Sequence, residues 1–235
     1  MSTRPESTFA DTTLAALIEK DSQIAHLKGN AYSNAASPER FEATKAGLEA
    51  KGFKVTVAEN KDDAFEKLKT LIPAGKSVNV AHSTTLEEIG FINYLMGETP
   101  YDNVRTKILA EKDPAKQAYL RRTIGTTVDY FLTSMASVTE SGEMAHGDFS
   151  GSKVGGVAFG AENVIVVVSS NKIVKDEAEA WKRMTEWCIP MASAFTREVF
   201  KAPGTTLTHY DVIRQANPTN PGRIQVLLIK EALGF

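Results

Sequence analysis

Residues 128–174 read VDYFLTSMASVTESGEMAHGDFSGSKVGGVAFGAENVIVVVSSNKIV, and they carry the clearest structural pattern in the chain. This segment holds two strand-like apolar runs, DYFLTSMASVT (129–139) and NVIVVVSS (163–170). The second run is continuously apolar, which is typical of a strand buried on both faces of a parallel sheet. A turn at Glu140–Glu143 and a Gly/Ser/Lys junction lie between the runs. Polar groups this dense between buried strands need water or a ligand as partners, so the pattern predicts a functional site here.

Strand-like and helical segments alternate on both sides of this region. FKVTVAE (53–59), SVNVA (77–81) and IQVLLIK (224–230) read as strands, while 38–50, 62–72 and 84–95 have helical spacing. Thr84 followed by Glu87 predicts a capping box at the start of the third helix. This alternation predicts an α/β fold, with a mostly parallel sheet covered by helices on both faces. We expect an N-terminal helical extension over residues 1–36, followed by a single domain over 37–235.

Composition and charge narrow the class of protein. Apolar residues make up 42% of the 235 residues and charged residues 24%, which is ordinary globular composition. A net charge of −2 without a Lys/Arg cluster argues against nucleic acid as a partner. No apolar run approaches the roughly 20 residues of a membrane span, and the first residues do not read as a signal peptide. We therefore expect a cytoplasmic protein with no membrane partner.

Two strand-to-helix junctions have the residues to hold an anion. The first is Ala81-His82-Ser83-Thr84-Thr85, and the second is Asp148-Phe149-Ser150-Gly151-Ser152-Lys153. Backbone N–H groups and hydroxyls gather at such junctions and favour carboxylates and phosphates, although Ser and Thr also serve as ordinary helix caps. Neither junction has the spacing of a nucleotide-binding loop. Together with other polar positions nearby, the ligand-binding candidates are His82, Ser83, Thr84, Thr85, Glu88, Ser134, Ser150, Gly151, Ser152, Lys153, Asn171 and Lys172.

Three residues are candidates for acid–base chemistry: Glu140, His146 and Asp148. Glu140 follows a buried strand, where burial could raise its pKa, but it could equally be a solvated turn residue. His146 lies two residues from Asp148, and an imidazole beside a carboxylate suits proton transfer near neutral pH. No metal motif occurs, so a metal site would need His82, His146 and Asp148 to meet in space. No cofactor is predicted, and whether a metal binds is left open.

The chain resembles the LUD family of lactate-utilization (LutC-like) proteins. The residues that carry the resemblance are SVNVAHSTTLEEIGF (77–91), the block from Asp129 to Asp176, and the terminal VLLIKEALGF (226–235). The resemblance implies a three-layer α/β fold similar to that of sugar-phosphate isomerases and CoA transferases. It also implies a carboxylate or phosphate ligand beyond the strand ends, with Glu140 and the Ser150–Lys153 junction in suitable positions.

Two departures from the family pattern affect what the resemblance implies. Many members carry a cysteine cluster near the C-terminus, but this chain has one cysteine, Cys188, and therefore no iron–sulfur cluster is expected in it. The family's usual Gly-Asn-Arg reads Gly151-Ser152-Lys153 here, which keeps the positive charge and loses the guanidinium fork.

Three functions follow from the sequence and stay open. The first is a LUD-family role in the metabolism of lactate or a related hydroxy or keto acid, with iron–sulfur partner proteins carrying the redox chemistry. The second is a stand-alone, cofactor-free isomerase, lyase or hydrolase acting on a small carboxylate. The third is a non-catalytic ligand-binding or scaffold protein. In each case we expect a homo-oligomer and a small anionic ligand.

Overall fold

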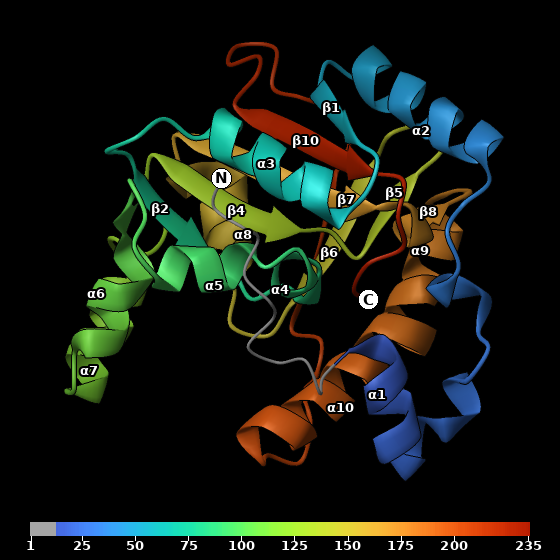
Figure 1. The fold of residues 1–235 in the computed structure, drawn as a ribbon, viewed down its shortest axis with the longest axis horizontal. Coiled ribbons are helices and arrows are strands. Elements are labelled where there is room, and N and C mark those ends of the chain that lie inside the picture. Colours follow the sequence, from blue (N-terminus) through green and yellow to red (C-terminus); the bar gives the residue numbers. More distant parts are fainter. Residues whose placement is uncertain (1–12) are drawn as a thin grey trace.

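A six-stranded parallel sheet forms the centre of the protein, in the computed structural model that describes residues 13–235 (Figure 1). The strand order is β1-β10-β7-β4-β2-β3, and every neighbouring pair is parallel. Their bounds are β1 (Lys54–Ala58), β2 (Ser77–Val80), β3 (Asp102–Asn103), β4 (Tyr130–Ser134), β7 (Asn163–Ser169) and β10 (Ile224–Ile229). The predicted α/β class with a mostly parallel sheet is confirmed.

Helices cover both faces of this sheet, which makes three layers. Along β7, Ile165 and Val167 face one core, while Val164, Val166 and Val168 face the other, as the two-residue period of a strand requires. The first core is closed by α3 (Lys61–Leu71), α4 (Thr84–Glu88) and α5 (Phe91–Met96). The second is closed by α2 (Pro38–Ala50), α6 (Val104–Ala110) and the π-helical turn Gly156–Gly160 that follows α8 (Ser152–Gly155). The helix α7 (Pro114–Arg122) follows α6 and projects with it at the lower left of Figure 1.

A second, four-stranded sheet lies beside the first, and the sequence did not predict it. Its order is β8-β5-β6-β9, with bounds β8 (Ile173–Val174), β5 (Ser137–Thr139), β6 (Met144–Asp148) and β9 (His209–Ile213). The strands β6 and β9 alternate histidines and acids with small or apolar residues, so hydrophobic periodicity gives them little signal. Their pairing, His146 opposite Asp211 and Asp148 opposite His209, makes them strands.

The prediction of one continuous strand over residues 129–139 is wrong. The chain leaves the central sheet at Ser134 and enters the second sheet at Ser137. Ala136, in the bend between the two strands, is already held beside the second sheet, because its N–H donates to the carbonyl of Ala145. Its own carbonyl accepts from Arg183 Nη1. Apolar character indicates that a strand is buried but not which strand it pairs with. The sequence pattern therefore did not predict the change of sheet.

The single helix predicted over residues 84–95 is also divided. Gly90 has a φ of 81°, which ends α4, and α5 starts immediately after it. The capping box predicted for Thr84 and Glu87 is wrong, because Ser83 is the N-cap and its hydroxyl accepts from the N–H of Leu86. Glu87 is instead buried beneath the helix.

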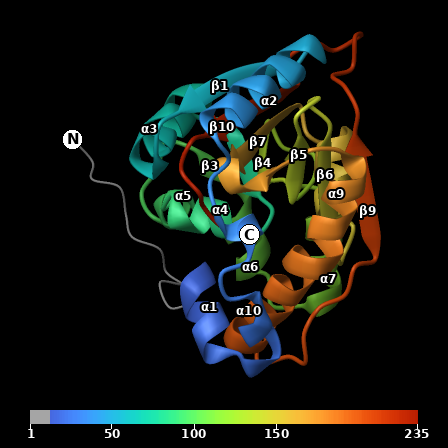
Figure 2. The same ribbon diagram turned by 90° about the vertical axis from the view of Figure 1, so that its right-hand side faces the viewer.

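The described part of the predicted N-terminal extension, residues 13–36, contains three short helices, while residues 1–12 lie outside the described part. It comprises α1 (Leu14–Lys20) and the 3₁₀ helices Ser22–Leu27 and Ala31–Ser33. Leu17, Ile24 and Leu27 share a core with Trp187 and Met191, which belong to the long helical stretch of α9 (Glu177–Arg183), the π-turn Met184–Cys188 and α10 (Ile189–Phe200). Figure 2 shows α1 beside α10. None of the helices in residues 13–235 has the length and apolar content needed to cross a membrane.

We predict that Gly47→Ala destabilises the protein, although alanine normally favours a helix. A Cβ at Gly47 in α2 would lie 2.5 Å from the carbonyl oxygen of Glu140 and 2.7 Å from the carbonyl carbon of Ser141. Overpacking against backbone of this kind costs about 1–3 kcal/mol, which exceeds the helix-propensity gain of about 1 kcal/mol. Urea denaturation measures the change, and Gly155→Ala is the matched control because its Cβ would lie 3.5 Å from Thr126 Cγ2. Equal stability of the two variants would contradict the packing argument.

Candidate functional site

The carboxyl ends of β2 and β4 form the topological switch point of the central sheet. From β2 the chain passes through α4 and α5 to β3 at one edge, whereas from β4 it reaches β7 on the other side through the second sheet and α8. Because α4 and α8 lie on opposite faces, a crevice opens between the two strand ends, and ligands of open α/β sheets bind in such crevices. A cavity of about 640 Å³ lies at this place.

Both predicted junctions meet in this cavity. His82, Ser83 and Thr84 line it from the end of β2, and Ser83 Oγ donates a hydrogen bond of 2.9 Å to Ser134 Oγ at the end of β4. From the second junction the polar lining residues are Asp148, Ser150, Ser152 and Lys153. Eight of the residues proposed from the sequence are therefore gathered around one space: His82, Ser83, Thr84, Ser134, Asp148, Ser150, Ser152 and Lys153.

The second junction is held in shape by Asp148. Its Oδ2 accepts the backbone N–H of Lys153 at 2.6 Å, and its Oδ1 accepts the N–H of Ser150 at 3.1 Å. Gly151 completes the turn with a φ of 79°, a left-handed conformation that favours glycine. Asp148 is therefore engaged with the backbone, and within residues 13–235 the ammonium of Lys153 has no hydrogen-bond or ion-pair partner.

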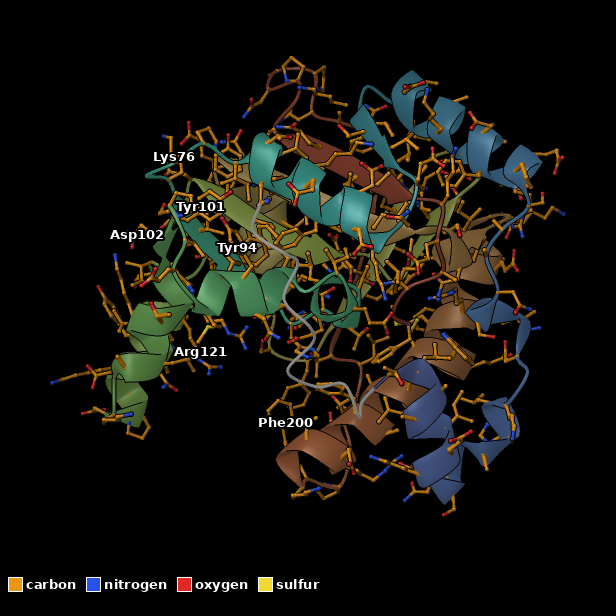
Figure 3. All side chains as sticks on the ribbon, viewed as in Figure 1. Lys76, Tyr94, Tyr101, Asp102, Arg121 and Phe200 are labelled. Atoms are coloured by element: carbon orange, nitrogen blue, oxygen red, sulfur yellow. The ribbon has the colours of Figure 1, made fainter. Side chains whose placement is uncertain are left out.

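Two arginines that sequence reasoning missed add positive charge to the cavity. Arg105 comes from α6 and Arg121 from α7, both in the charged helical segment that follows β3. Arg105 Nη1 reaches only the carbonyl of Val80 at 3.5 Å, and Arg121 is exposed without a partner in the described part of the chain. Figure 3 labels Arg121 on α7 and Phe200 at the end of α10, which line the cavity from these two helices. The sequence feature that could have pointed to these two arginines was the weak apolar face of this helical segment.

Burial, and after it the positive charge, shifts the pKa values of the titratable groups at the cavity. The His82 side chain is exposed toward the cavity, and the partial loss of water around it, followed by the positive charges of Arg105 and Lys153, lowers its pKa. The imidazole is therefore neutral at pH 7. Burial lowers the pKa of Lys153 against the opposing effect of Asp148. Behind the cavity, burial raises the pKa of Glu87 to about 7, opposed by Arg105. The cavity thus has more cationic than anionic groups.

Glu140 and His146 do not line the cavity. Glu140 lies in the turn between β5 and β6, where its Oε1 accepts from Arg40 Nε at 2.6 Å. His146 is fully buried on β6, with Nε2 3.3 Å from Asp211 Oδ2, and burial lowers its pKa while Asp211 opposes the shift. His82, His146 and Asp148 are not assembled into one centre, and no group of three or more His, Cys, Asp or Glu residues in the described part could hold a metal ion.

The remaining candidates form a second cluster that binds the chain's own C-terminal segment. Asn171 Nδ2 donates to the carbonyl of Gly234 at 2.9 Å, and the N–H of Gly234 donates to Glu88 Oε2 at 3.1 Å. Lys172 is fully buried and donates to Thr85 Oγ1 at 2.7 Å, and burial lowers its pKa to about 7. Thr85, Glu88, Asn171 and Lys172 therefore have partners within the protein.

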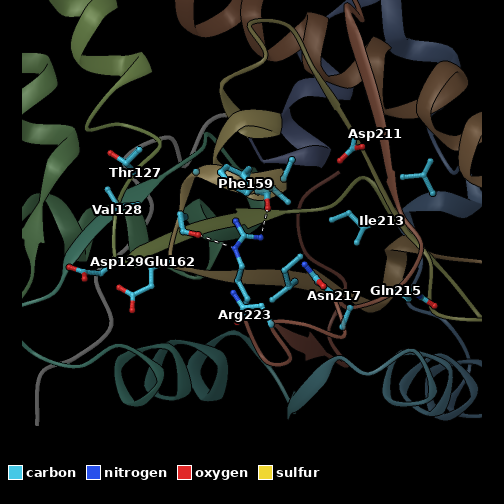
Figure 4. Close-up of a pocket in the computed structure, with 18 of the residues that line it drawn as sticks. Thr127, Val128, Asp129, Phe159, Glu162, Asp211, Ile213, Gln215, Asn217 and Arg223 are labelled. Carbon is cyan, nitrogen blue, oxygen red and sulfur yellow. Dashed lines mark hydrogen bonds between the residues drawn. The ribbon is translucent and has the colours of Figure 1, made fainter.

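A second cavity of about 690 Å³ lies at the amino ends of the central strands (Figure 4). Its arginine, Arg223, donates to the carbonyls of Val157 at 2.8 Å and Ala161 at 3.0 Å, and so closes the π-helical turn after α8. Its Asp129 accepts from the N–H of Ser77 and from Lys76, and these hydrogen bonds hold the pKa of Asp129 at about 2. These charges have structural partners, unlike Arg121 and Lys153 at the switch point.

Comparison with known proteins identifies the family. The sequence profile of the LUD domain matches residues 41–231, which is most of the chain. The chain belongs to the LUD family. The resemblance inferred from the sequence is thus confirmed. The LUD chain is also similar to the crystal structure of a DUF162 family protein from Deinococcus radiodurans, with a TM-score of 0.46 and 13% identity over 83% of the LUD chain and 99% of that chain. No curated protein matches its sequence.

We predict that Glu87 makes the stability of this LUD protein fall with rising pH. The folded pKa of about 7 lies above the ordinary glutamate value of 4.5, so between these values the folded state holds a proton that the unfolded state has lost. The resulting loss between pH 5 and pH 8 is on the order of 2 kcal/mol.

Urea denaturation at both pH values of the parent protein and of Glu87→Gln measures this contribution. From pH 5 to pH 8 the parent protein should lose this stability and Glu87→Gln should not. Glu98→Gln, at an exposed position, is the matched control and should behave like the parent protein. An identical pH dependence of Glu87→Gln and the parent protein would rule out the buried proton on Glu87.

Proposed function

We propose that this LUD protein binds a small organic acid, a carboxylate or a phosphorylated acid, in the cavity at the ends of β2 and β4. The observation that carries the proposal is the excess of positive charge there, from Arg105, Arg121 and Lys153. Positive charges that face a common cavity repel one another, and an anion bound between them offsets that repulsion. A bound carboxylate or phosphate would supply that charge through charge-assisted hydrogen bonds.

The hydroxyl groups of the cavity suit the rest of a hydroxy acid. Ser83 and Ser134 lie on one wall, and Ser150 and Ser152 lie on the wall that carries Lys153. Hydroxyls both donate and accept, so they can bind either an α-hydroxyl or an α-keto oxygen. Membership of the LUD family and this donor set together favour lactate or a related hydroxy or keto acid as the ligand.

Oxidation of such an acid would need an electron acceptor from outside the chain. The protein has one cysteine, Cys188, so iron–sulfur partner proteins would carry the electrons, and this chain would bind the acid as a homo-oligomer. A non-catalytic binding or scaffold function differs from this role only in the absence of turnover.

A second candidate is a cofactor-free isomerase, lyase or hydrolase, and His82 favours it. The imidazole lines the cavity, so its unprotonated nitrogen could accept a carbon-bound proton from a bound acid. Exchange of carbon-bound hydrogen of pyruvate or a 2-hydroxy acid in D₂O, followed by NMR, tests this chemistry. Exchange that His82→Gln abolishes supports an enzyme, and binding without exchange supports a non-catalytic role.

We predict that Lys153→Met weakens the binding of lactate, pyruvate or phosphate at least about tenfold, as loss of one charge-assisted hydrogen bond implies. Arg121→Ala should weaken binding by a smaller factor, because the exposed guanidinium is screened by water and salt. Isothermal titration calorimetry at low and high salt measures both effects.

The neighbouring Arg122→Ala is the matched control, since Arg122 is exposed and does not line the cavity. Its affinity for the acid should equal that of the parent protein. Failure of all three anions to bind the parent protein, or equal losses in Arg121→Ala and Arg122→Ala, would refute the proposed site.

A further inference from the structure

The cavity is much larger than a three-carbon acid. A hydroxy acid such as lactate has about six non-hydrogen atoms, which at roughly 30 Å³ for each water-sized atom fill about 180 Å³. The cavity has about 640 Å³, so less than a third of it would be used. Cavities of this size ordinarily bind ligands several times larger than lactate.

The space beyond the charged groups is apolar. Met135, Met184, Ile189 and Leu207 line it, and the ring of Phe195 lies 4.4 Å from that of His82 between ring centroids. These side chains come from the end of β4, from the helical stretch that ends in α10, and from the connection to β9. A ligand that filled this part would need a hydrocarbon or aromatic group.

The exposed part of the cavity lining also contains large apolar side chains. Three large hydrophobic side chains line the cavity while remaining exposed, Leu109 at 43%, Phe149 at 63% and Phe200 at 66%. They come from α6, from the junction before α8 and from the end of α10, so three separate parts of the fold bring them to one cavity. Scattered exposed hydrophobics need no explanation, but a group of them around one opening marks a binding site.

We propose that the ligand of this site is an amphipathic acid, whose carboxylate meets Lys153, Arg105 and Arg121 and whose hydrocarbon tail runs along the apolar wall to the opening. The inference rests on the proposed function, because it keeps the same anion site and adds the tail. A 2-hydroxy acid of eight carbons has about eleven non-hydrogen atoms and fills roughly 330 Å³, about half of the cavity.

The test is a chain-length series of 2-hydroxy acids from three to ten carbons, titrated by calorimetry at concentrations below micelle formation. Burial of each added methylene should raise the affinity about fourfold until the tail leaves the cavity. 1-Octanol, which has the tail without the carboxylate, should bind far more weakly than 2-hydroxyoctanoate. Lys153→Met should lower the affinity of every acid by the same factor.

Phe149→Ser and Phe200→Ser should flatten the gain per methylene for the longer acids and leave lactate affinity unchanged. Phe159→Ser is the matched control, because Phe159 is 90% exposed and lines the cavity at the opposite ends of the strands. An affinity independent of chain length, with lactate still bound and sensitive to Lys153→Met, would overturn the tail and keep the proposed function. Absence of binding by every acid would overturn both.

Discussion

The parallel pairing of β4 with β7 is the constraint on which the rest of this structure depends. The register sets Leu132 opposite Ile165 and Ser134 opposite Val167, deep between the two helical layers. Neither strand can turn back on its neighbour in so enclosed a position, so each must continue away from the sheet at its carboxyl end. β4 continues into the second sheet and α8, which brings Asp148 and Lys153 to the end of β2. The cavity at the ends of β2 and β4 therefore depends on the point at which the chain leaves β4.

The polar side chains at the end of β7 differ in their partners from those at the ends of β2 and β4. At the end of β7, polar side chains are satisfied by the protein itself: Ser169 Oγ donates to the carbonyl of Leu233, and Asn171 bonds Leu233 and Gly234 from both sides of its amide. At the ends of β2 and β4, polar groups face a cavity, and the ammonium of Lys153 finds no partner within residues 13–235. The polar groups at the end of β7 are therefore satisfied within the protein, whereas those at the ends of β2 and β4 remain accessible from the cavity, as the proposed binding of an anion requires.

Arg183 connects the point where the chain changes sheet with the helical stretch beside the cavity. Its guanidinium is fully buried, donates to the carbonyl of Ala136 where the chain changes sheet, and donates to Cys188 Sγ at 3.0 Å. Ala136 and Cys188 both line the cavity. One buried guanidinium thus links the exit of β4 to the helical stretch that supplies the apolar wall of the cavity.

The sequence alone was sufficient to predict the fold class, the family and the two junctions that line the cavity. The reason is that the apolar run NVIVVVSS and the junctions at His82 and Ser150 are local properties of the chain. The sequence alone was not sufficient for the sheet change after Ser134, for β6 and β9, or for Arg105 and Arg121 as cavity residues. Each of these depends on which segments pack together, and apolar periodicity carries no information on partners. Tertiary packing alone separated Lys153, which faces open space, from Lys172, which is buried against Thr85. The two lysines differ because Lys172 bonds Thr85, which itself bonds the carbonyl of Leu233 in the C-terminal segment, whereas Lys153 lines the cavity.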